Sequence, residues 1–219
     1  MKIAIDGPAG SGKSTIAKIL SKELNLPYLD TGKVYRAFAY IAKEEGIDMT
    51  NTKQVLSLFD KAPVVHISVA KTEVSIGGKC LDVELKGEDT GRYASMMGSI
   101  PEFRERMVKF FRKLVGDAQV VAEGRDVGTH IFPDAPIKLF ITASLEERAR
   151  RRFLELSGVS FQEVLKALAE RDKRDMERPI YPFKPAEDAI IVDTTGKSIE
   201  QAVEEVLRII KGRAIKLRE

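Results

Sequence analysis

The sequence predicts an α/β fold in which a parallel sheet of five strands is covered by helices on both faces. Two observations predict it: short, continuously apolar segments recur along the chain, and segments with helical periodicity separate them. Strands that are buried on both faces of a parallel sheet have this composition. A third observation, one stretch of strict alternation, predicts a small antiparallel insertion. The expected parallel strands cover residues 3–5, 26–29, 119–122, 137–141 and 189–192.

The first strand leads into a glycine-rich loop and then a helix expected over residues 13–25. The stretch GPAGSGKS fits G-x-x-x-x-G-K-[ST] between a strand and a helix, the context that this motif requires. Glycines let the backbone aim its N–H groups inward, and the helix adds its positive end. Lys13 can reach the outer phosphates of a nucleoside triphosphate, and the Ser14 hydroxyl suits Mg²⁺. The residues expected to bind these groups are Gly7, Pro8, Ala9, Gly10, Ser11, Gly12, Lys13, Ser14 and Thr15.

Composition limits the classes of protein that the chain can form. A length of 219 residues suits one α/β domain with at most a small insertion. A net charge of +3 favours anionic ligands, but it is too small and too evenly mixed to indicate nucleic-acid binding. The single cysteine, Cys80, excludes an internal disulfide and a cysteine-rich metal site.

The sequence also lacks the features of secreted and membrane proteins. No apolar run approaches the roughly 18 residues of a membrane span. The first strand begins at once and leaves no room for a signal peptide. We therefore expect a cytoplasmic protein with no membrane partner, and we expect a monomer.

Turn and cap residues predict the next elements. The strand over 26–29 is followed by Thr31, where the chain turns into a second helix. The first turns of that helix carry Lys33, Tyr35 and Arg36. Asn51, with Gln54 three residues later, predicts a cap for a helix that continues to Phe59.

Residues 63–85 change character and alternate with a period of two, which predicts a β-meander inserted between helices. Its strands are expected over 64–69, 73–76 and 80–85. Gly77 and Gly78 are typical of a hairpin turn. His66 lies alone in the first of these strands, so we expect an ordinary surface or core residue rather than a ligand.

Helices resume after the meander. They are expected over 88–97, 101–115, 145–156, 161–177 and 198–212. Serines followed three residues later by Glu or Gln predict N-caps at Ser99, Ser144, Ser160 and Ser198. Pro101 suits the first turn of its helix. The tail over 213–219 is expected to be exposed.

Polar segments follow the strands and should share one edge of the sheet, because ligands of such sheets bind beyond the carboxyl ends of the strands. The segments that this rule gathers are 7–14, 30–36, 123–126 and 142–144. Three arginines belong to this edge or to helices near it: Arg36, Arg104 and Arg125. The site is therefore predicted to be composite.

The helix over 161–177 carries a stripe that changes from apolar to ionic. Its apolar members are Phe161, Val164 and Leu168, and steps of three and four residues extend the same face to Arg171, Arg174 (slightly offset), Asp175 and Arg178. Such a face leaves the core and enters either a polar cavity or solvent. A solvated helix with i,i+4 ion pairs is the alternative.

Many guanidinium groups near a triphosphate loop fit phosphoryl transfer, in which catalysis is mostly positioning and electrostatic stabilisation. Arginine also holds an acceptor phosphate with two parallel hydrogen bonds. A phosphate acceptor is already an anionic nucleophile, so it needs no general base, and the sequence offers no obvious buried base. His130 is the only histidine near this edge, and we expect it to be structural.

In its motifs the chain resembles the bacterial-type cytidylate kinases, a branch of the nucleoside monophosphate kinases. The matching stretches run nearly from end to end: IDGPAGSGKST (5–15), LDTGKVYR (29–36), GRDVGT (124–129), FPDAP (132–136), EERA (146–149) and ERDKRD (170–175). The resemblance implies a P-loop NTPase-type three-layer fold and a single kinase domain over 1–219. It also implies that 63–85 belongs to a monophosphate-binding subdomain and that helices over 145–178 carry an arginine-rich lid.

The same resemblance implies an enzyme that transfers a phosphoryl group from ATP, with Mg²⁺, to CMP or dCMP. Lys13, Arg125 and Arg178 would be catalytic. Thr31, Arg36, Arg125 and Arg178 would hold the acceptor phosphate, and Tyr35, Arg171 and Asp175 would surround its ribose. Ser95, Arg104 and Asp126 would read the base.

The assignment of Asp126 also has a chemical basis. Cytosine presents an amino donor at its 4-position, which a carboxylate can accept, whereas uracil presents an acceptor there. A polar group left unpaired in a buried site costs about 1–3 kcal/mol, so discrimination follows. The chain departs from the family at Glu123, where aspartate is usual, and around Ser157-Gly158, where the lid is short. The resemblance implies that one of four lid arginines closes on the donor phosphates: Arg148, Arg150, Arg151 or Arg152.

Three other functions stay open at this point. The first is a kinase that acts on a sugar or a hydroxy acid. The second is a P-loop nucleotide switch, although the Asn-Lys-x-Asp motif of a guanine-specific switch does not occur. The third is a nucleic-acid binder, against which stand the few aromatic residues in 63–85 and the lack of a basic track.

Overall fold

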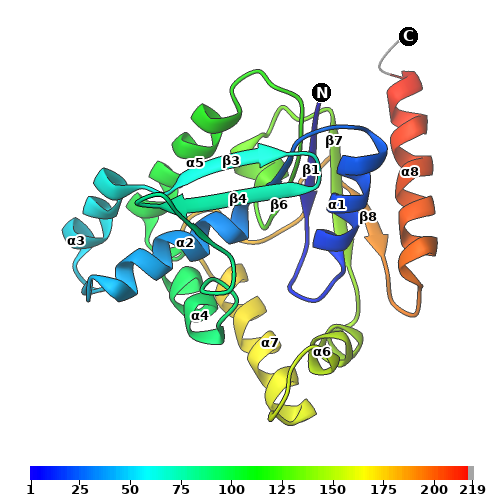
Figure 1. The fold of residues 1–219 in the computed structure, drawn as a ribbon. Coiled ribbons are helices and arrows are strands. Elements are labelled where there is room, and N and C mark those ends of the chain that lie inside the picture. The colour runs from blue at the N-terminus through cyan, green and yellow to red at the C-terminus, as the bar shows by residue number, and fades with distance from the viewer. Residues whose placement is uncertain (217–219) are drawn as a thin grey trace.

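The elements follow one another as alternating strands and helices in the computed structural model, which describes residues 1–216 apart from the side chains of residues 88 and 214–216. In chain order they are β1 (Lys2–Asp6), α1 (Lys13–Glu23), β2 (Tyr28–Asp30), α2 (Thr31–Glu44), α3 (Thr52–Ser57), η1 (Leu58–Lys61), β3 (Val64–Ser68), β4 (Lys71–Ile76), β5 (Lys79–Leu81), α4 (Glu88–Met97), α5 (Pro101–Val115), β6 (Val120–Gly124), η2 (Val127–Ile131), β7 (Ile137–Thr142), α6 (Leu145–Leu154), α7 (Phe161–Met176), β8 (Ile190–Asp193) and α8 (Ile199–Lys216). Figure 1 shows their arrangement.

A parallel sheet of five strands forms the centre, in the order β2-β6-β1-β7-β8. The central strand β1 pairs with β6 on one side, where Ile3 aligns with Val121, and with β7 on the other, where Ile3 aligns with Ile137. These are the five strands that the sequence predicts. The predicted α/β fold with a five-stranded parallel sheet is confirmed.

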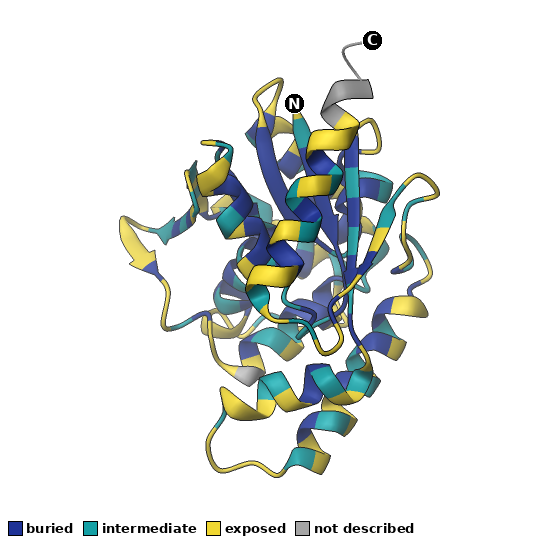
Figure 2. Ribbon diagram, turned by 90° about the vertical axis from the view of Figure 1, so that its right-hand side faces the viewer, coloured by how far each residue is buried: buried dark blue, intermediate teal, exposed yellow. Residues whose placement is uncertain are grey.

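Successive residues of β1 enter two different cores. Ile3 and Ile5 pack with residues of α1 and α8, whereas Ala4 between them packs with residues of α2 and α5. This follows from the period of two in a strand, which sends neighbouring side chains to opposite faces. Figure 2 shows the strands of the sheet mostly buried between helices whose outer faces are exposed. The result is a three-layer sandwich.

The inserted meander forms a second, antiparallel sheet in the order β3-β4-β5, as predicted. Its middle strand attaches to β2 through the hydroxyl of Thr72, which accepts a hydrogen bond from the Asp30 N–H (2.9 Å) and donates one to the Tyr28 carbonyl (2.7 Å). The third strand is shorter than the predicted 80–85 and ends at Leu81. The alternating pattern continues, but Leu85 is buried in the main core and the Asp82 carboxylate pairs with Lys33, so the chain leaves the sheet.

The predicted caps at Asn51, Ser160 and Ser198 are confirmed by hydrogen bonds to the N–H group three residues on. The cap at Ser144 is also formed, but without the reciprocal half of a capping box, because the Glu147 carboxylate pairs with Arg150 and Arg151 instead. The cap at Ser99 is wrong. Ile100 is the N-cap of α5, and the Ser99 hydroxyl donates to the carbonyl of Ser95 (3.2 Å).

The last helix is longer than predicted. The sequence predicts an end near Gly212, but α8 runs through this glycine to Lys216, and of the predicted tail only 217–219 lie outside the described residues. A glycine in a helix interior costs only about 1 kcal/mol relative to alanine, which is too little to end a helix whose preceding turns pack on the sheet.

Helices α6 and α7 project beyond the carboxyl edge of the sheet and lie at the bottom of Figure 1. They pack on each other through a small core of their own, formed by Ala149, Val164 and Leu168. A buried ion pair between Arg148 of α6 and Asp172 of α7 (2.7 Å) joins them as well. None of the helices in residues 1–216 has the length and apolar composition needed to cross a bilayer.

Candidate active site

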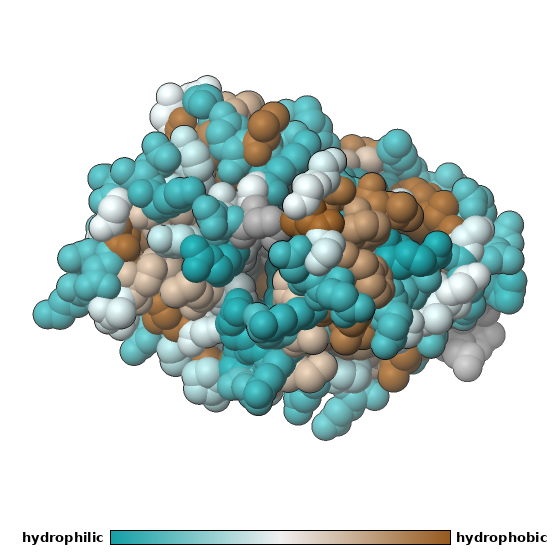
Figure 3. Space-filling view, turned by 90° about the horizontal axis from the view of Figure 1, so that it is seen from below, coloured by the Kyte–Doolittle hydropathy of each residue, from teal (hydrophilic) through white to brown (hydrophobic). Residues whose placement is uncertain are grey.

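One large cavity, of about 920 Å³, opens at the carboxyl edge of the parallel sheet. Seen from the side of α6 and α7, the surface is hollowed near its centre, and mostly hydrophilic side chains surround the hollow (Figure 3). The sequence-predicted site residues that line the cavity are Ala9, Gly10, Ser11, Gly12, Lys13, Ser14, Thr15, Thr31, Tyr35, Arg36, Ser95, Arg104, Arg125, Asp126, Arg171, Asp175 and Arg178. The chain therefore brings together the P-loop and the predicted arginines.

Two predicted P-loop residues, Gly7 and Pro8, lie behind the cavity wall. A Cβ atom on Gly7 would lie 2.0 Å from the carbonyl oxygen of Ile141, so only glycine allows this close approach of the loop to β7. The carbonyl of Pro8 accepts a hydrogen bond from the Lys13 Nζ (3.3 Å). These residues shape the loop rather than line the cavity.

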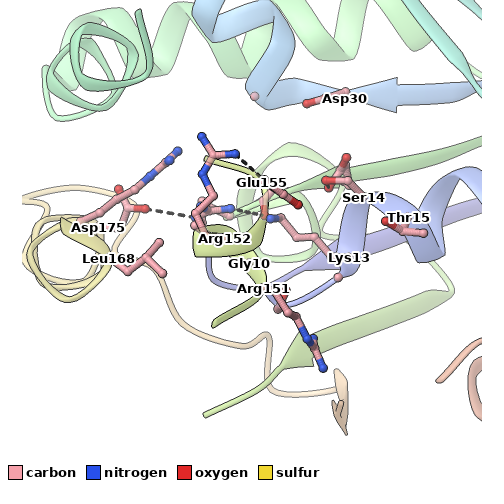
Figure 4. A pocket seen from close by; sticks show the side chains of 18 of the residues that line it. Gly10, Lys13, Ser14, Thr15, Asp30, Arg151, Arg152, Glu155, Leu168 and Asp175 are labelled. Carbon is pink, nitrogen blue, oxygen red and sulfur yellow. Dashed lines mark hydrogen bonds and ion pairs between the residues drawn. The ribbon is translucent and has the colours of Figure 1, made fainter. Parts of the chain in front are cut away.

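The P-loop ends in a helix N-terminus that is open to a ligand. Its N-cap, Gly12, has a left-handed conformation (φ 86°) and no side-chain cap occupies the first N–H groups of α1. Figure 4 shows Lys13, Ser14 and Thr15 on one side of the cavity, and Asp175 and Leu168 of α7 on the opposite side. Burial, and then the nearby Arg125, lower the pKa of Lys13 to about 7. An anionic ligand would offset both effects.

The carboxylate of Asp6 joins the P-loop to the segment after β6. It accepts hydrogen bonds from the N–H groups of Val127 and Gly128, both at 2.8 Å. These donors directly follow Arg125 and Asp126, so the last residue of β1 fixes the loop that carries both predicted site residues. Burial raises the pKa of Asp6 to about 7, against the opposing effect of the two N–H donors.

Three arginines surround the buried carboxylate of Asp175. Arg125 donates to it (3.1 Å), Arg178 pairs with its other oxygen, and Arg171 is close enough to contribute electrostatically. Burial raises the pKa of Asp175, but Arg125, Arg178 and Arg171 more than offset it, so the net pKa is lowered. Arg178 is buried, yet its Nε and Nη1 have no hydrogen-bond partner in the described part of the chain. This arrangement holds cationic groups ready for an anion.

A second buried ion pair, between Arg104 and Asp126 (2.6 Å), lies at another wall of the cavity. The rings of Tyr35 and Tyr181 each lie about 6 Å from the Arg104 guanidinium, on the scale of cation–π contacts. The hydroxyl of Ser95 accepts a hydrogen bond from Arg174 (3.2 Å). Arg174 is slightly off the predicted ionic face of its helix, and sequence reasoning did not include it in the site.

Glu123, near the end of β6, connects three elements. One carboxylate oxygen accepts a hydrogen bond from the Ser14 hydroxyl (2.8 Å), and the other accepts one from the hydroxyl of Tyr28. Its backbone carbonyl accepts from the Thr31 hydroxyl (2.7 Å). Burial, and then Asp30, raise the pKa of Glu123. No sequence pattern pointed to Tyr28, which lies 95 residues before Glu123.

The structure separates the four candidate lid arginines. Arg148 is buried and donates to the carbonyls of Ala9 and Ala143, so it braces the loop instead of facing the cavity. Arg150 lies on the exposed surface. Arg151 and Arg152 line the cavity, and Arg151 is held by Glu147 and Thr194 (2.9 and 3.0 Å).

Two other predictions about this edge have mixed outcomes. The prediction that residues 142–144 belong to the site is wrong, since they are not among those lining the cavity; the Thr142 carbonyl instead accepts from Thr194 and the Ser144 N–H donates to Thr195. His130 packs against the ring of Tyr181, with ring centres 4.1 Å apart, and it does not line the cavity either. Sequence reasoning missed Thr194, Lys197 and Ile199, which line the cavity next to the P-loop.

The fold and this cavity define a P-loop kinase: a phosphate-binding loop faces a second cluster of arginines across one space. A family model described as Cytidylate kinase matches residues 3–212. The chain is 56% identical to the cytidylate kinase of Aquifex aeolicus (98% of this chain, 97% of that protein) and 41% identical to that of Alkaliphilus oremlandii (97% and 98%). The chain therefore belongs to the cytidylate kinase family.

A comparison with solved structures agrees on the fold. An uncharacterized protein from Eubacterium ventriosum superposes with a TM-score of 0.55 over 96% of this chain and 98% of that one, at 16% identity. At that identity the likeness concerns the fold alone.

Proposed function

We propose that the chain transfers the γ-phosphoryl group of ATP to the phosphate of CMP or dCMP, giving ADP and the corresponding diphosphate. The observation that carries this proposal is the presence of two anion-binding groups in one cavity. The P-loop is the first, and Arg36, Arg125 and Arg178 are the second. Membership of the cytidylate kinase family supports the same conclusion.

The donor phosphates would bind the open N-terminus of α1, with Lys13 on the outer phosphates. Mg²⁺ prefers a few oxygen ligands and keeps several waters, and the Ser14 hydroxyl beside the buried Glu123 carboxylate fits that preference. When bound, the ion neutralises charge on the phosphates. Arg151 and Thr194 line the cavity beside this loop, where the rest of the donor nucleotide would extend.

The acceptor phosphate would lie between Thr31, Arg36, Arg125 and Arg178. Guanidinium groups bind a phosphate through paired hydrogen bonds and stabilise the charge that spreads over the transferred group. Because the attacking oxygen is already anionic, no residue has to remove a proton. Tyr35, Arg171 and Asp175 would surround the ribose of the acceptor.

Ser95, Arg104 and Asp126 would read the base. Asp126 can accept the amino group of cytosine, and Arg104 and Ser95 can donate to its ring acceptors. The buried state of the Arg104–Asp126 pair supports this assignment, since an incorrect base would leave a polar group unpaired without water to compensate.

Further expectations about organisation and setting belong to the same proposal. We infer a single kinase domain over 1–219 that works as a cytoplasmic monomer on small nucleotides, without nucleic acid or membrane partners. Residues 63–85 would belong to the monophosphate-binding subdomain, which their attachment to β2 beside Asp30 supports. Helices over 145–178 would form the lid, whose closure excludes water from the reacting phosphates.

A coupled assay of ADP formation with MgATP and CMP, dCMP, UMP or AMP tests the proposal. The expected result is turnover with CMP and dCMP at a kcat/KM well above that with UMP and AMP. Preference for AMP would contradict the assignment of the base. Turnover only with a sugar or a hydroxy acid would contradict the transfer to a nucleotide phosphate.

A further inference from the structure

Tyr28 is a buried polar residue in the core formed with α1, and the proposed reaction has no direct use for it. It lies in β2, next to β6 in the sheet, and its side chain is only 1% exposed. Its hydroxyl donates a hydrogen bond to one carboxylate oxygen of Glu123, at the end of β6. A buried tyrosine hydroxyl needs such a partner. This partner, Glu123, also contacts Ser14 in the proposed ATP site.

Two hydroxyl groups donate hydrogen bonds to the buried Glu123 carboxylate and so hold it in place. It is 2% exposed, and its two carboxylate oxygens accept from Tyr28 on one side and from Ser14 (2.8 Å) on the other. A buried carboxylate that loses a donor loses part of what offsets its desolvation cost, and it relieves that cost by moving. Such a movement would alter its contact with Ser14.

The direction of the Ser14 hydrogen bond matters for what Ser14 can bind. A serine hydroxyl has one proton and two lone pairs. While the proton points to Glu123, the lone pairs are left for a cation on the other side. If Glu123 swung away, the Ser14 proton would be free to rotate toward the metal position. Residues that orient a metal ligand in this way typically change metal affinity or activity by about 10–100-fold when removed.

We propose that Tyr28 is a positioning residue of the donor site, which holds Glu123 so that Ser14 presents a lone pair to the metal ion of the bound nucleotide. This inference rests on the proposed function, which puts Mg²⁺ at Ser14. It assigns no contact between Tyr28 and substrate. The acceptor half of the cavity, around Arg104 and Arg178, would not depend on Tyr28.

The test is Tyr28→Phe, which removes one oxygen and keeps the buried ring. Binding of Mn²⁺ in the presence of a non-hydrolysable ATP analogue, followed by electron paramagnetic resonance, should weaken by about tenfold or more. The Mg²⁺ concentration needed for half-maximal turnover should rise in parallel, and CMP affinity should stay within about twofold. The matched control is Tyr40→Phe, which removes a tyrosine hydroxyl from α2 outside the cavity lining and should change none of these.

A double-mutant cycle with Glu123→Gln separates positioning from a general loss of structure. Glu123→Gln alone should weaken Mn²⁺ binding while leaving the Tyr28 ring in place, and adding Tyr28→Phe to it should cost little more. Mn²⁺ affinity in Tyr28→Phe within twofold of wild type would overturn the inference. So would an equal loss of Mn²⁺ and CMP binding, or a full additional loss in the double variant. If wild type neither binds Mn²⁺ with the analogue nor phosphorylates CMP, the proposed function fails as well.

Discussion

Arg104 and Asp126 form an ion pair of 2.6 Å whose members are 2% and 3% exposed. Within the described chain, the Nε of Arg104 has no hydrogen-bond partner. Buried polar groups are nearly always satisfied, and an unsatisfied one needs an explanation such as a ligand that is not present. In the proposed function that ligand is the base of the acceptor nucleotide.

Asp126→Asn should change which base is accepted. The amide keeps the shape of the side chain but replaces the carboxylate that accepts the cytosine amino group. We expect kcat/KM for CMP to fall by about 10–100-fold, from the 1–3 kcal/mol of a base contact, and the UMP:CMP ratio to rise. Asp117→Asn, on the exposed surface, is the control. An unchanged ratio would contradict the role of Asp126.

Arg178→Met should damage the acceptor side alone. Asp175 keeps its hydrogen bond from Arg125, so the variant does not leave the buried carboxylate without a partner. Loss of one charge-stabilising donor typically lowers kcat by about 10²–10³. We expect that loss with CMP, while ATP binding measured by calorimetry stays within about twofold. Arg150→Met is the control, and equal losses of ATP and CMP binding would refute the assignment.

Gly124→Ala should disturb Thr31, which lies across from it. A Cβ atom at Gly124 would lie 2.5 Å from the Thr31 hydroxyl and 2.8 Å from a methyl group of Val127. Thr31 must move, and it was expected to hold the acceptor phosphate. The KM for CMP should rise about tenfold, the scale of one lost hydrogen bond to a charged group, with the KM for ATP unchanged.

Gly91→Ala is the matched control for that substitution. Gly91 lies in α4, and a Cβ atom there would meet nothing within 4 Å. Alanine should stabilise the helix by up to about 1 kcal/mol without changing either KM. An equal rise of the CMP KM in both variants would contradict this account, because it would show that Gly124→Ala does not act through the displacement of Thr31.

Asp6 should make stability depend on pH. Burial raises its pKa to about 7, whereas the unfolded value is about 4. A group whose pKa is higher in the folded state contributes most below its unfolded pKa, and this contribution is lost as the pH rises through 7. Linkage then predicts that wild type loses about 2–3 kcal/mol of unfolding free energy between pH 5 and pH 8 that Asp6→Asn does not lose. Urea unfolding at both pH values measures the difference, and parallel losses would contradict it.

Features set by local or periodic patterns could be predicted from the sequence. The five apolar strands, the P-loop and the stripe from Val164 to Asp175 all follow from spacing within one segment, and the rule about strand ends brought distant loops to one cavity. The comparison with known families then established the family. Here local preference and tertiary packing agree.

Features that depend on contacts between distant segments could not be predicted. Tyr28 meets Glu123 and Arg148 meets Asp172 only because the strands and helices that carry them pack side by side. The wrong cap at Ser99 has a different, local origin: its hydroxyl donates to the carbonyl of Ser95 in the last turn of α4, an alternative that the capping pattern does not exclude. Likewise, the pattern in 82–85 suits a strand, yet the burial of Leu85 draws the chain away.

A crystal structure with CMP and a non-hydrolysable ATP analogue tests the central claim most directly. The account predicts the CMP phosphate between Arg36, Arg125 and Arg178, facing the terminal phosphate held by Lys13. It also predicts the cytosine amino group at hydrogen-bond distance from Asp126. A CMP molecule bound with its phosphate away from these arginines, or with its base away from Asp126, would contradict the account.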